Sequence, residues 1–118
     1  MNKICTTIEQ SVKLLELGID VNSADMCWQN NEFPIGFNDD DAIPAWSLSG
    51  LLGLMPFHII ENNERYGFYQ RKGLNTQGET YCFEYKSNNG ERLYKTNHLN
   101  NPIDAAFEMI VWLKKNVK

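Results

Sequence analysis

The stretch TYCFEYKSNNGERLYKT, residues 80–96, decides the fold class of this chain. Aromatic residues stand at every second position in its first half, which is the period of a half-buried β-strand. With the Asn-Gly dipeptide as a two-residue turn, Tyr85 lies opposite Tyr94 and Glu84 lies opposite Lys95, and both are favourable cross-strand pairs. This register also places three aromatic residues on the face that we expect the helices to cover: Tyr81, Phe83 and Tyr85.

A second predicted hairpin precedes the first. The runs FHII and YGFY within residues 57–69 have the same period of two. A two-residue turn at Asn62 and Asn63 would set Glu61 opposite Glu64, which is a like-charge pair, so we expect a longer loop there. Between the hairpins, RKGLNTQGE at 71–79 has no periodicity and contains two glycines. These features predict an exposed, mobile, basic loop.

Capping signals predict three helices around these strands. TTIEQ at 6–10 is a capping box, in which either threonine can cap the helix and the Glu or Gln three residues later reaches back. Ser47 can cap a helix through LSGLLGLM, which Pro56 stops. Asn101 followed by Pro102 is a strong start for the last helix.

The second helix contains two glycines, Gly50 and Gly53, three positions apart. Each lowers helix stability by roughly 0.5–1 kcal/mol relative to Ala. A helix tolerates that loss best where another backbone approaches closely. The same pair also fits a frayed or 3₁₀ segment, and both interpretations remain open at this point.

The last helix is apolar on more than one face. One stripe runs from Ile103 to Leu113, but Met109, Val111 and Trp112 widen it. A small domain can rarely bury so broad a stripe alone, so a homodimer contact through this helix is one hypothesis. The alternative is deep burial between the sheet and another helix.

The predicted fold is α+β, in a single domain over residues 1–118. An antiparallel sheet of about four strands, formed by two hairpins, spans 57–96. About three helices, near 7–17, 47–55 and 102–115, pack mainly on one face of that sheet.

Composition indicates one soluble globular domain: 118 residues, 42% apolar and 12% aromatic, with 11 basic against 15 acidic side chains and a net charge of −4. An acidic balance argues against nonspecific binding to nucleic acid or an anionic membrane. The charge is uneven, however. Residues 65–95 carry six basic and three acidic side chains, whereas residues 1–64 carry ten acidic and two basic ones. Such a split is typical of a polar interaction surface, of two oppositely charged faces that pair between copies, or of charge needed only for solubility.

Cysteine usage predicts a reducing, cytoplasmic location. Cys5, Cys27 and Cys82 are odd in number and widely spaced, with no C-x-x-C pair. We interpret Cys82, inside a strand-like run, as a small buried hydrophobe rather than a nucleophile. No stretch resembles a signal peptide or approaches the length of a membrane span, so we expect no membrane association.

The chain carries no recognisable catalytic, cofactor or metal signature. Phosphate-binding, dinucleotide-binding, zinc-protease and nucleophile-elbow motifs are all absent from the sequence. His58, on a strand, is interpreted as a half-buried structural histidine, and His98 as solvated. The acidic run at Asp39, Asp40 and Asp41 lies in a predicted loop, 29–45, and lacks the spacing of a calcium site. We therefore predict no catalytic residue, no metal and no cofactor.

Three segments carry a resemblance: SADMCW at 23–28, IPAWSLSGLL at 43–52 and NPIDAAFEMI at 101–110. In that order they resemble a group of small proteins from gut Bacteroidales and their phages or mobile elements, which share S/T-A-D-M, I-P-A-W-S-L-S and N-P-hydrophobic-D/E-A segments. The group has no assigned activity. The resemblance covers both ends of the chain and little between about 57 and 98. It implies a compact α+β domain and a mobile-element origin, and it transfers no catalytic role to any residue here.

Two classes of function fit these observations, with a weaker third. The first is a non-enzymatic protein-interaction or accessory factor with an unknown protein partner or a second copy. The second is a ligand-binding protein or enzyme with a site between the 29–45 loop and the sheet. The third is single-strand nucleic-acid binding through the basic hairpins, which the acidic net charge disfavours. The candidate interaction residues are Met109, Trp112, Trp46, Trp28, Asp39, Asp40, Asp41, Arg71 and Lys72.

Overall fold

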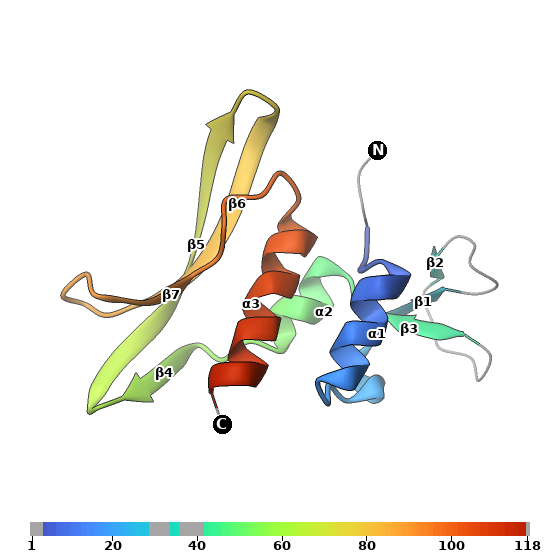
Figure 1. Cartoon of the computed structure of the whole chain (residues 1–118), viewed down its shortest axis with the longest axis horizontal. Coiled ribbons are helices and arrows are strands. Elements are labelled where there is room, and N and C mark those ends of the chain that lie inside the picture. Colours follow the sequence, from blue (N-terminus) through green and yellow to red (C-terminus); the bar gives the residue numbers. More distant parts are fainter. Residues whose placement is uncertain (1–3, 29–33, 36–41, 118) are drawn as a thin grey trace.

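The computed structural model describes residues 4–28, 34–35 and 42–117 and confirms the α+β fold (Figure 1). Its helical elements are α1 (Ile8–Glu16), the 3₁₀ turn η1 (Val21–Ser23), α2 (Leu48–Gly53) and α3 (Pro102–Asn116). Its strands are β1 (Met26–Trp28), β2 (Pro34–Ile35), β3 (Ile43–Ala45), β4 (His58–Glu61), β5 (Glu64–Asn75), β6 (Gly78–Lys86) and β7 (Arg92–Lys95). The three main helices begin and end within about two residues of their predicted bounds.

The large sheet has four antiparallel strands in the order β4-β5-β6-β7. Tyr85 pairs with Tyr94 and Glu84 with Lys95, so the predicted register is confirmed there. The predicted two-residue turn is wrong, because an irregularity after Tyr85 makes Lys86 pair with Arg92. A five-residue connection over 87–91 results, and its single glycine takes a positive φ of 87°.

The β4–β5 turn is tighter than predicted. Asn62 and Asn63 have positive φ values of 52° and 65°, and Glu61 pairs directly with Glu64. Asparagine tolerates left-handed backbone, and two such residues suit the turn that matches the twist of a hairpin. Turn geometry therefore outweighs the repulsion between two carboxylates that lie at the solvent-exposed end of the sheet.

The predicted loop at 71–79 is instead the tip of a long hairpin. β5 and β6 pair continuously from Gly67 opposite Lys86 to Asn75 opposite Gly78. Most side chains from position 69 to 79 are exposed, so this part of the hairpin requires no apolar alternation. Because the period-two signal reports burial on one face, it disappears where the strands extend beyond the helices (Figure 1).

Helix α3 lies against the face of the sheet that carries Phe83 and Tyr85, here called the inner face, and also against α2. The core therefore forms between α3 and β6, with Leu14 of α1 and Leu51 of α2 completing it. The α3 residues that are buried in this core are Ile103, Ala105, Ala106, Met109, Ile110 and Leu113. Deep burial, rather than a homodimer contact, thus accounts for much of the breadth of the apolar stripe.

The N-terminal part of the chain packs around α1, which also contributes Leu14 to the core. Thr7 caps α1 and Gln10 completes the capping box: the Gln10 N–H donates to Thr7 Oγ1 at 3.1 Å, and the Thr7 N–H donates to Gln10 Oε1 at 3.0 Å. A small sheet of order β2-β1-β3 lies beside this helix. The predicted 29–45 loop therefore contains short strands at 34–35 and 43–45, and residues 29–33 and 36–41 lie outside the described residues.

The glycines of α2 differ in their surroundings. A Cβ built on Gly50 would lie 2.9 Å from Oδ1 of Asp25, whereas one on Gly53 would meet nothing within 4 Å. The expected close approach therefore exists at Gly50, and a carboxylate rather than a backbone makes it.

Candidate functional site

Several predicted interaction residues belong to the interior. Met109 and Trp46 are completely buried, so neither side chain is available to a partner. Trp112 stacks on Tyr94 with ring centroids 4.5 Å apart and ring planes within 6°. Trp28 is half-buried and donates its indole N–H to the Thr6 carbonyl at 2.9 Å. These tryptophans and this methionine stabilise the fold, which explains their apolar character without a partner.

The proposed ligand site between the 29–45 loop and the sheet is largely undescribed. Asp39, Asp40 and Asp41 lie outside the described residues. His58, predicted to be half-buried, is exposed, because it lies on the edge strand β4 and faces away from the helices. Over residues 4–28, 34–35 and 42–117, no group of three His, Cys, Asp or Glu side chains could hold a metal ion.

The long strand β5 leaves part of one edge open. Phe68 donates its N–H to the Phe57 carbonyl at 3.0 Å, and β4 extends no further along β5. Because backbone polar groups alternate between the two edges of an antiparallel strand, Gln70, Lys72 and Leu74 direct their N–H and C=O groups to that same edge. No strand in the described part of the chain lies beside them (Figure 1). Three edge positions are therefore unpaired, while the other edge of β5 is fully paired with β6.

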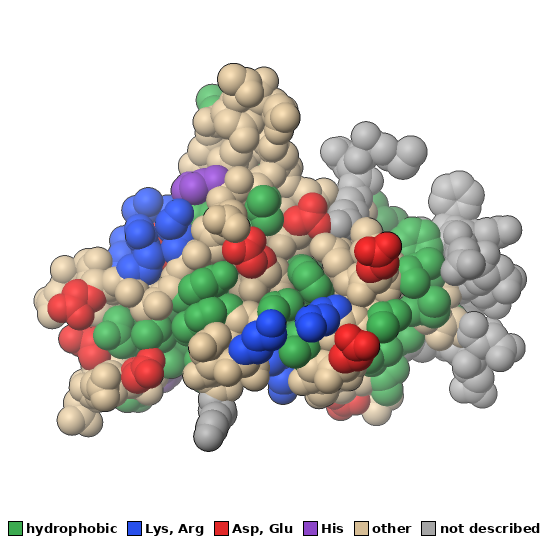
Figure 2. All heavy atoms as spheres, in the orientation of Figure 1, with side chains coloured by type: hydrophobic (Ala, Val, Ile, Leu, Met, Phe, Trp, Pro, Cys, Tyr) green, Lys and Arg blue, Asp and Glu red, His purple; other side chains and the backbone are tan. Residues whose placement is uncertain are grey.

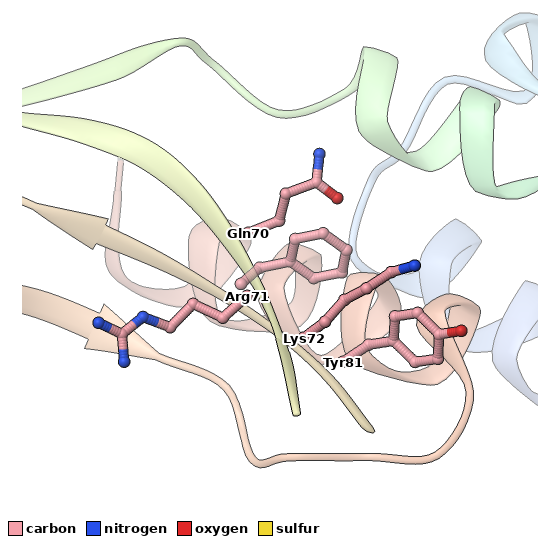
Figure 3. Close-up of a pocket in the computed structure, with 5 residues that line it drawn as sticks. Gln70, Arg71, Lys72 and Tyr81 are labelled. Atoms are coloured by element: carbon pink, nitrogen blue, oxygen red, sulfur yellow. The ribbon is translucent and has the colours of Figure 1, made fainter. Parts of the chain in front are cut away.

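A hollow of about 250 Å³ opens on the inner face beside this edge. Gln70, Lys72, Tyr81 and Phe83 line it, together with Arg71. Figure 3 shows Gln70, Lys72 and Tyr81 directed to one side of the hairpin and Arg71 to the other. Side chains of an added strand would alternate between the two faces, and those on the inner face would enter this hollow.

Lys72 gives the open edge a positive charge. Its side chain is 72% exposed, with Nζ 3.7 Å from Oε2 of Glu79 and 5.6 Å from the centroid of the Tyr81 ring. An exposed ion pair of this kind contributes at most about 1 kcal/mol, so another carboxylate can replace Glu79. Leu74, the next edge position, is 81% exposed. The edge thus combines unpaired backbone, one cation and one exposed apolar side chain.

The opposite face of the sheet, here called the outer face, contains a buried carboxylate. Glu84 is completely buried, and its oxygens contact Nε of Arg71 at 2.7 Å and Nε of Arg92 at 2.9 Å. Glu84 Oε2 makes no hydrogen bond of good geometry, so its contact with Arg71 is mainly electrostatic. The three side chains come from β6, β5 and β7, and the ion pairs therefore connect three strands.

The thiol of Cys82 lies next to this group. Burial raises the pKa of Cys82, the Glu84 charge raises it further, and Lys95, Arg71 and Arg92 act in the opposite direction. A buried thiol whose pKa is raised is a poor nucleophile. The interpretation of Cys82 as a small buried hydrophobe is confirmed by its complete burial.

No family model, curated protein or solved structure matches this chain. None of the helices formed by the described residues is long and apolar enough to cross a membrane.

Two of the segments that carry the Bacteroidales resemblance lie side by side. Met26 pairs with Ala45 between β1 and β3, and the Trp46 indole N–H donates to Ser23 Oγ at 3.0 Å. Asp25 accepts hydrogen bonds from Ser47. These contacts give the two segments a shared structural role, and the origin that the resemblance implies stays a prediction.

Sequence reasoning named Arg71 and Lys72 but placed them together in one basic loop. The structure separates them, because consecutive residues of a strand point to opposite faces. Glu84 and the open edge of β5 were missed. A signal for Glu84 was present, since an acidic residue inside the aromatic run must be buried or paired. Nothing in the sequence indicated that β4 ends before β5 does.

Proposed function

We propose that this protein is a non-enzymatic interaction factor that binds an extended segment of another protein as an added strand on the open edge of β5. The observation that carries the proposal is the row of unpaired backbone groups at Gln70, Lys72 and Leu74 beside the inner-face hollow. Addition of a strand to an exposed sheet edge is a common mode of peptide recognition. Main-chain hydrogen bonds supply affinity, and side-chain hollows supply specificity.

The edge favours a partner with an acidic residue. Each of the three positions offers one N–H and one C=O, and each hydrogen bond formed contributes about 0.5–1.5 kcal/mol net. A carboxylate of the partner opposite Lys72 replaces the weak contact with Glu79. An apolar side chain on the inner face of the added strand contacts Tyr81 in the hollow.

A second copy of this chain is a poorer occupant of the same edge. Antiparallel self-pairing centred on Lys72 sets two ammonium groups opposite each other, and pairing centred on Arg71 sets two guanidinium groups opposite each other. Like charges in directly opposed positions destabilise a strand pair. Lysine on an edge strand is one of the devices by which proteins avoid edge-to-edge association. These arguments favour a different protein as the partner over a homodimer.

The resemblance of the motif segments supports an accessory role in a phage or mobile element of Bacteroidales. The odd number and wide spacing of Cys5, Cys27 and Cys82 support a reducing, cytoplasmic compartment.

The test uses a displayed library of random peptides selected on the full chain. We expect enrichment of peptides with alternating apolar residues and one Asp or Glu, and protection of the Gln70, Lys72 and Leu74 amides from hydrogen exchange when the selected peptide binds. Lys72→Pro removes an edge N–H that has no partner among the described residues and should abolish binding. Thr76→Pro, in the turn at the hairpin tip, is the matched control and should leave binding unchanged.

Charge reversal provides a second arm of the test. Lys72→Glu should lose the acidic peptides and select basic ones. The proposal is wrong if no extended peptide is enriched, or if the selected peptides bind Lys72→Pro as tightly as the unaltered chain. Light scattering on the free chain detects self-pairing, and a dimer that Lys72→Pro dissociates would replace the partner proposed here with a second copy.

A further inference from the structure

Two arginines on the outer face are held side by side by one buried carboxylate. Each guanidinium uses Nε to contact a different oxygen of Glu84, at 2.7 Å for Arg71 and 2.9 Å for Arg92. A guanidinium has five N–H donors, so each arginine keeps both terminal nitrogens for other partners. The two side chains are 50% and 43% exposed, and no further hydrogen bond of either is found within the described residues. The result is a pair of donor forks with fixed positions that are open to solvent.

The surrounding positions on the outer face are also basic. The register places Arg65, Arg71 and Lys86 on the same side of the sheet as Arg92 and Lys95. Among the strand positions of the described outer face, Glu84 is the one acidic residue. Figure 2 shows Lys and Arg side chains gathered over the region where β5, β6 and β7 lie together. The described strand positions of the outer face therefore carry five positive side chains and one buried negative one, and Arg71 and Arg92 contact that negative charge directly.

An aromatic ring lies within this basic group. Tyr69 pairs with Glu84 across β5 and β6 and stands two residues before Arg71 on the same face, about 7 Å along the strand. Its side chain is 44% exposed, and Nζ of Lys86 lies 5.2 Å from the ring centroid. Tyr69 also covers Gly67, whose Cβ would lie 3.6 Å from the ring. The Tyr69 ring thus packs over the backbone of Gly67, and its exposed surface lies beside the arginine pair.

We propose that the outer face binds single-stranded nucleic acid, with backbone phosphates on the terminal nitrogens of Arg71 and Arg92 and a neighbouring base stacked on Tyr69. Arginine forks match the geometry of phosphate oxygens, and their anchoring by Glu84 removes part of the side-chain entropy lost on binding. A base can stack on a tyrosine only when it is unpaired, which selects a single strand over a duplex.

The net charge of −4 does not oppose this binding. Charges separated by more than about 8 Å are largely screened at physiological ionic strength, so the local excess of basic groups decides the interaction. Glu91 directly precedes Arg92, and Glu79 lies on β6 but on the inner face, where it contacts Lys72. Glu61 and Glu64 lie at the end of the β4–β5 hairpin, beside Arg65. The basic side chains around Glu84 still outnumber these acidic ones. The argument that the negative net charge opposes nucleic-acid binding therefore does not apply to the outer face.

The test measures fluorescence anisotropy of a labelled oligothymidylate with the full chain over a range of salt concentrations. We expect Arg92→Gln to weaken binding about tenfold and to lower the salt slope by about 0.7, the value for one single-strand phosphate contact. Tyr69→Leu should weaken binding about tenfold with an unchanged salt slope, because it removes stacking and no charge. Lys114→Ala, which removes an exposed charge from the end of α3, is the control and should bind normally.

Loss of folding and nonspecific binding of polyanions each require a separate control experiment. Because loss of Arg92 leaves Glu84 underneutralised, the double variant Arg92→Gln with Glu84→Gln should restore stability but not binding. The proposal is overturned if that folded double variant binds as the unaltered chain does. It is also overturned if Tyr69→Leu has no effect while dextran sulfate competes as well as the oligonucleotide, since the face would then be a nonspecific polyanion site. Inorganic phosphate should compete only weakly, because it offers no base to Tyr69.

Discussion

Asp25 holds the N-terminus of α2 through Ser47. One carboxylate oxygen accepts the Ser47 backbone N–H at 2.8 Å, and the other accepts the Ser47 hydroxyl. Ser47 Oγ in turn accepts the Gly50 N–H at 3.1 Å, as the cap of the helix. The carboxylate lies so close to Gly50 that no Cβ fits there without displacing it. The close approach of the Asp25 carboxylate therefore explains why residue 50, in the middle of a short helix, is a glycine.

Gly50→Ala and Gly53→Ala should change stability in opposite directions. Alanine at 53 meets nothing and should add about 0.5–1 kcal/mol through better helix propensity. Alanine at 50 must push Asp25 from Ser47 and should cost about 1 kcal/mol or more, the usual loss when a cap is removed. Chemical denaturation of both variants measures this. Equal effects of the two changes would contradict the role given to Asp25.

The amides along β5 should differ in hydrogen exchange in an alternating pattern. Gln70, Lys72 and Leu74 face the open edge and should exchange rapidly, whereas Arg71 and Gly73 are paired with β6 and should be protected. Exchange followed by NMR on the free chain resolves each amide. Uniform protection from 70 to 74 would mean that another segment covers the edge, and uniform rapid exchange would mean that the hairpin tip does not form.

Glu84→Gln should destabilise the fold by about 1–3 kcal/mol, less than the ~3–5 kcal/mol for a fully buried pair, because both arginines are half exposed and remain hydrated. The amide cannot neutralise two guanidinium groups, which then repel each other. Glu79→Gln is the matched control on the same strand. Its ion pair with Lys72 is exposed and 3.7 Å long, so it should change stability by less than about 0.5 kcal/mol. Thermal or urea unfolding compares the two variants.

Stability should fall in alkaline solution from about pH 9 upward. Burial raises the pKa of Cys82 and of Tyr85, and burial together with Glu108 raises the pKa of Tyr94. The unfolded chain therefore loses these protons at lower pH than the folded chain does. The free energy of unfolding is unaffected below the unfolded pKa values and decreases between the unfolded and folded ones.

Urea titration at several pH values checks this expectation. Each proton held only by the folded chain contributes a slope of about 1.4 kcal/mol per pH unit. Tyr94→Phe removes one such proton and should make the decline shallower. A stability that stays constant from neutral to strongly alkaline pH would show that these groups titrate alike in both states.

The sequence predicted those elements that bury an apolar face. The aromatic period of β6 placed Phe83 and Tyr85 on the helix side, and the capping residues located all three helices. The prediction failed in segments whose conformation does not depend on the burial of apolar side chains. The pairing of 71–75 with 78–82 is held by backbone hydrogen bonds and leaves no apolar pattern. The turn at Asn62 follows local backbone geometry, which outweighs the charge argument used against it.

The candidate surfaces were predicted less well than the fold. Trp46 and Met109 are residue types that favour either an interface or a core, and only packing decides between them. The open edge of β5 depends on the different lengths of β4 and β5, which no local pattern encodes. The arginine pair on Glu84 joins residues from three strands and could be recognised only once the register was known.

The tip of the β5–β6 hairpin, which extends beyond the helices, can accept substitutions during evolution without loss of the fold. Residues 70–79 are mostly exposed and contribute little to the core between α3 and β6. Exposed substitutions away from the core usually alter stability by less than about 0.5 kcal/mol. New side chains at Gln70, Lys72 and Leu74 can therefore be tried by mutation while the rest of the molecule stays folded. Substitutions are costly in the buried helices and tolerated at the tip, so chains that differ only at the tip could bind different partners with the same architecture.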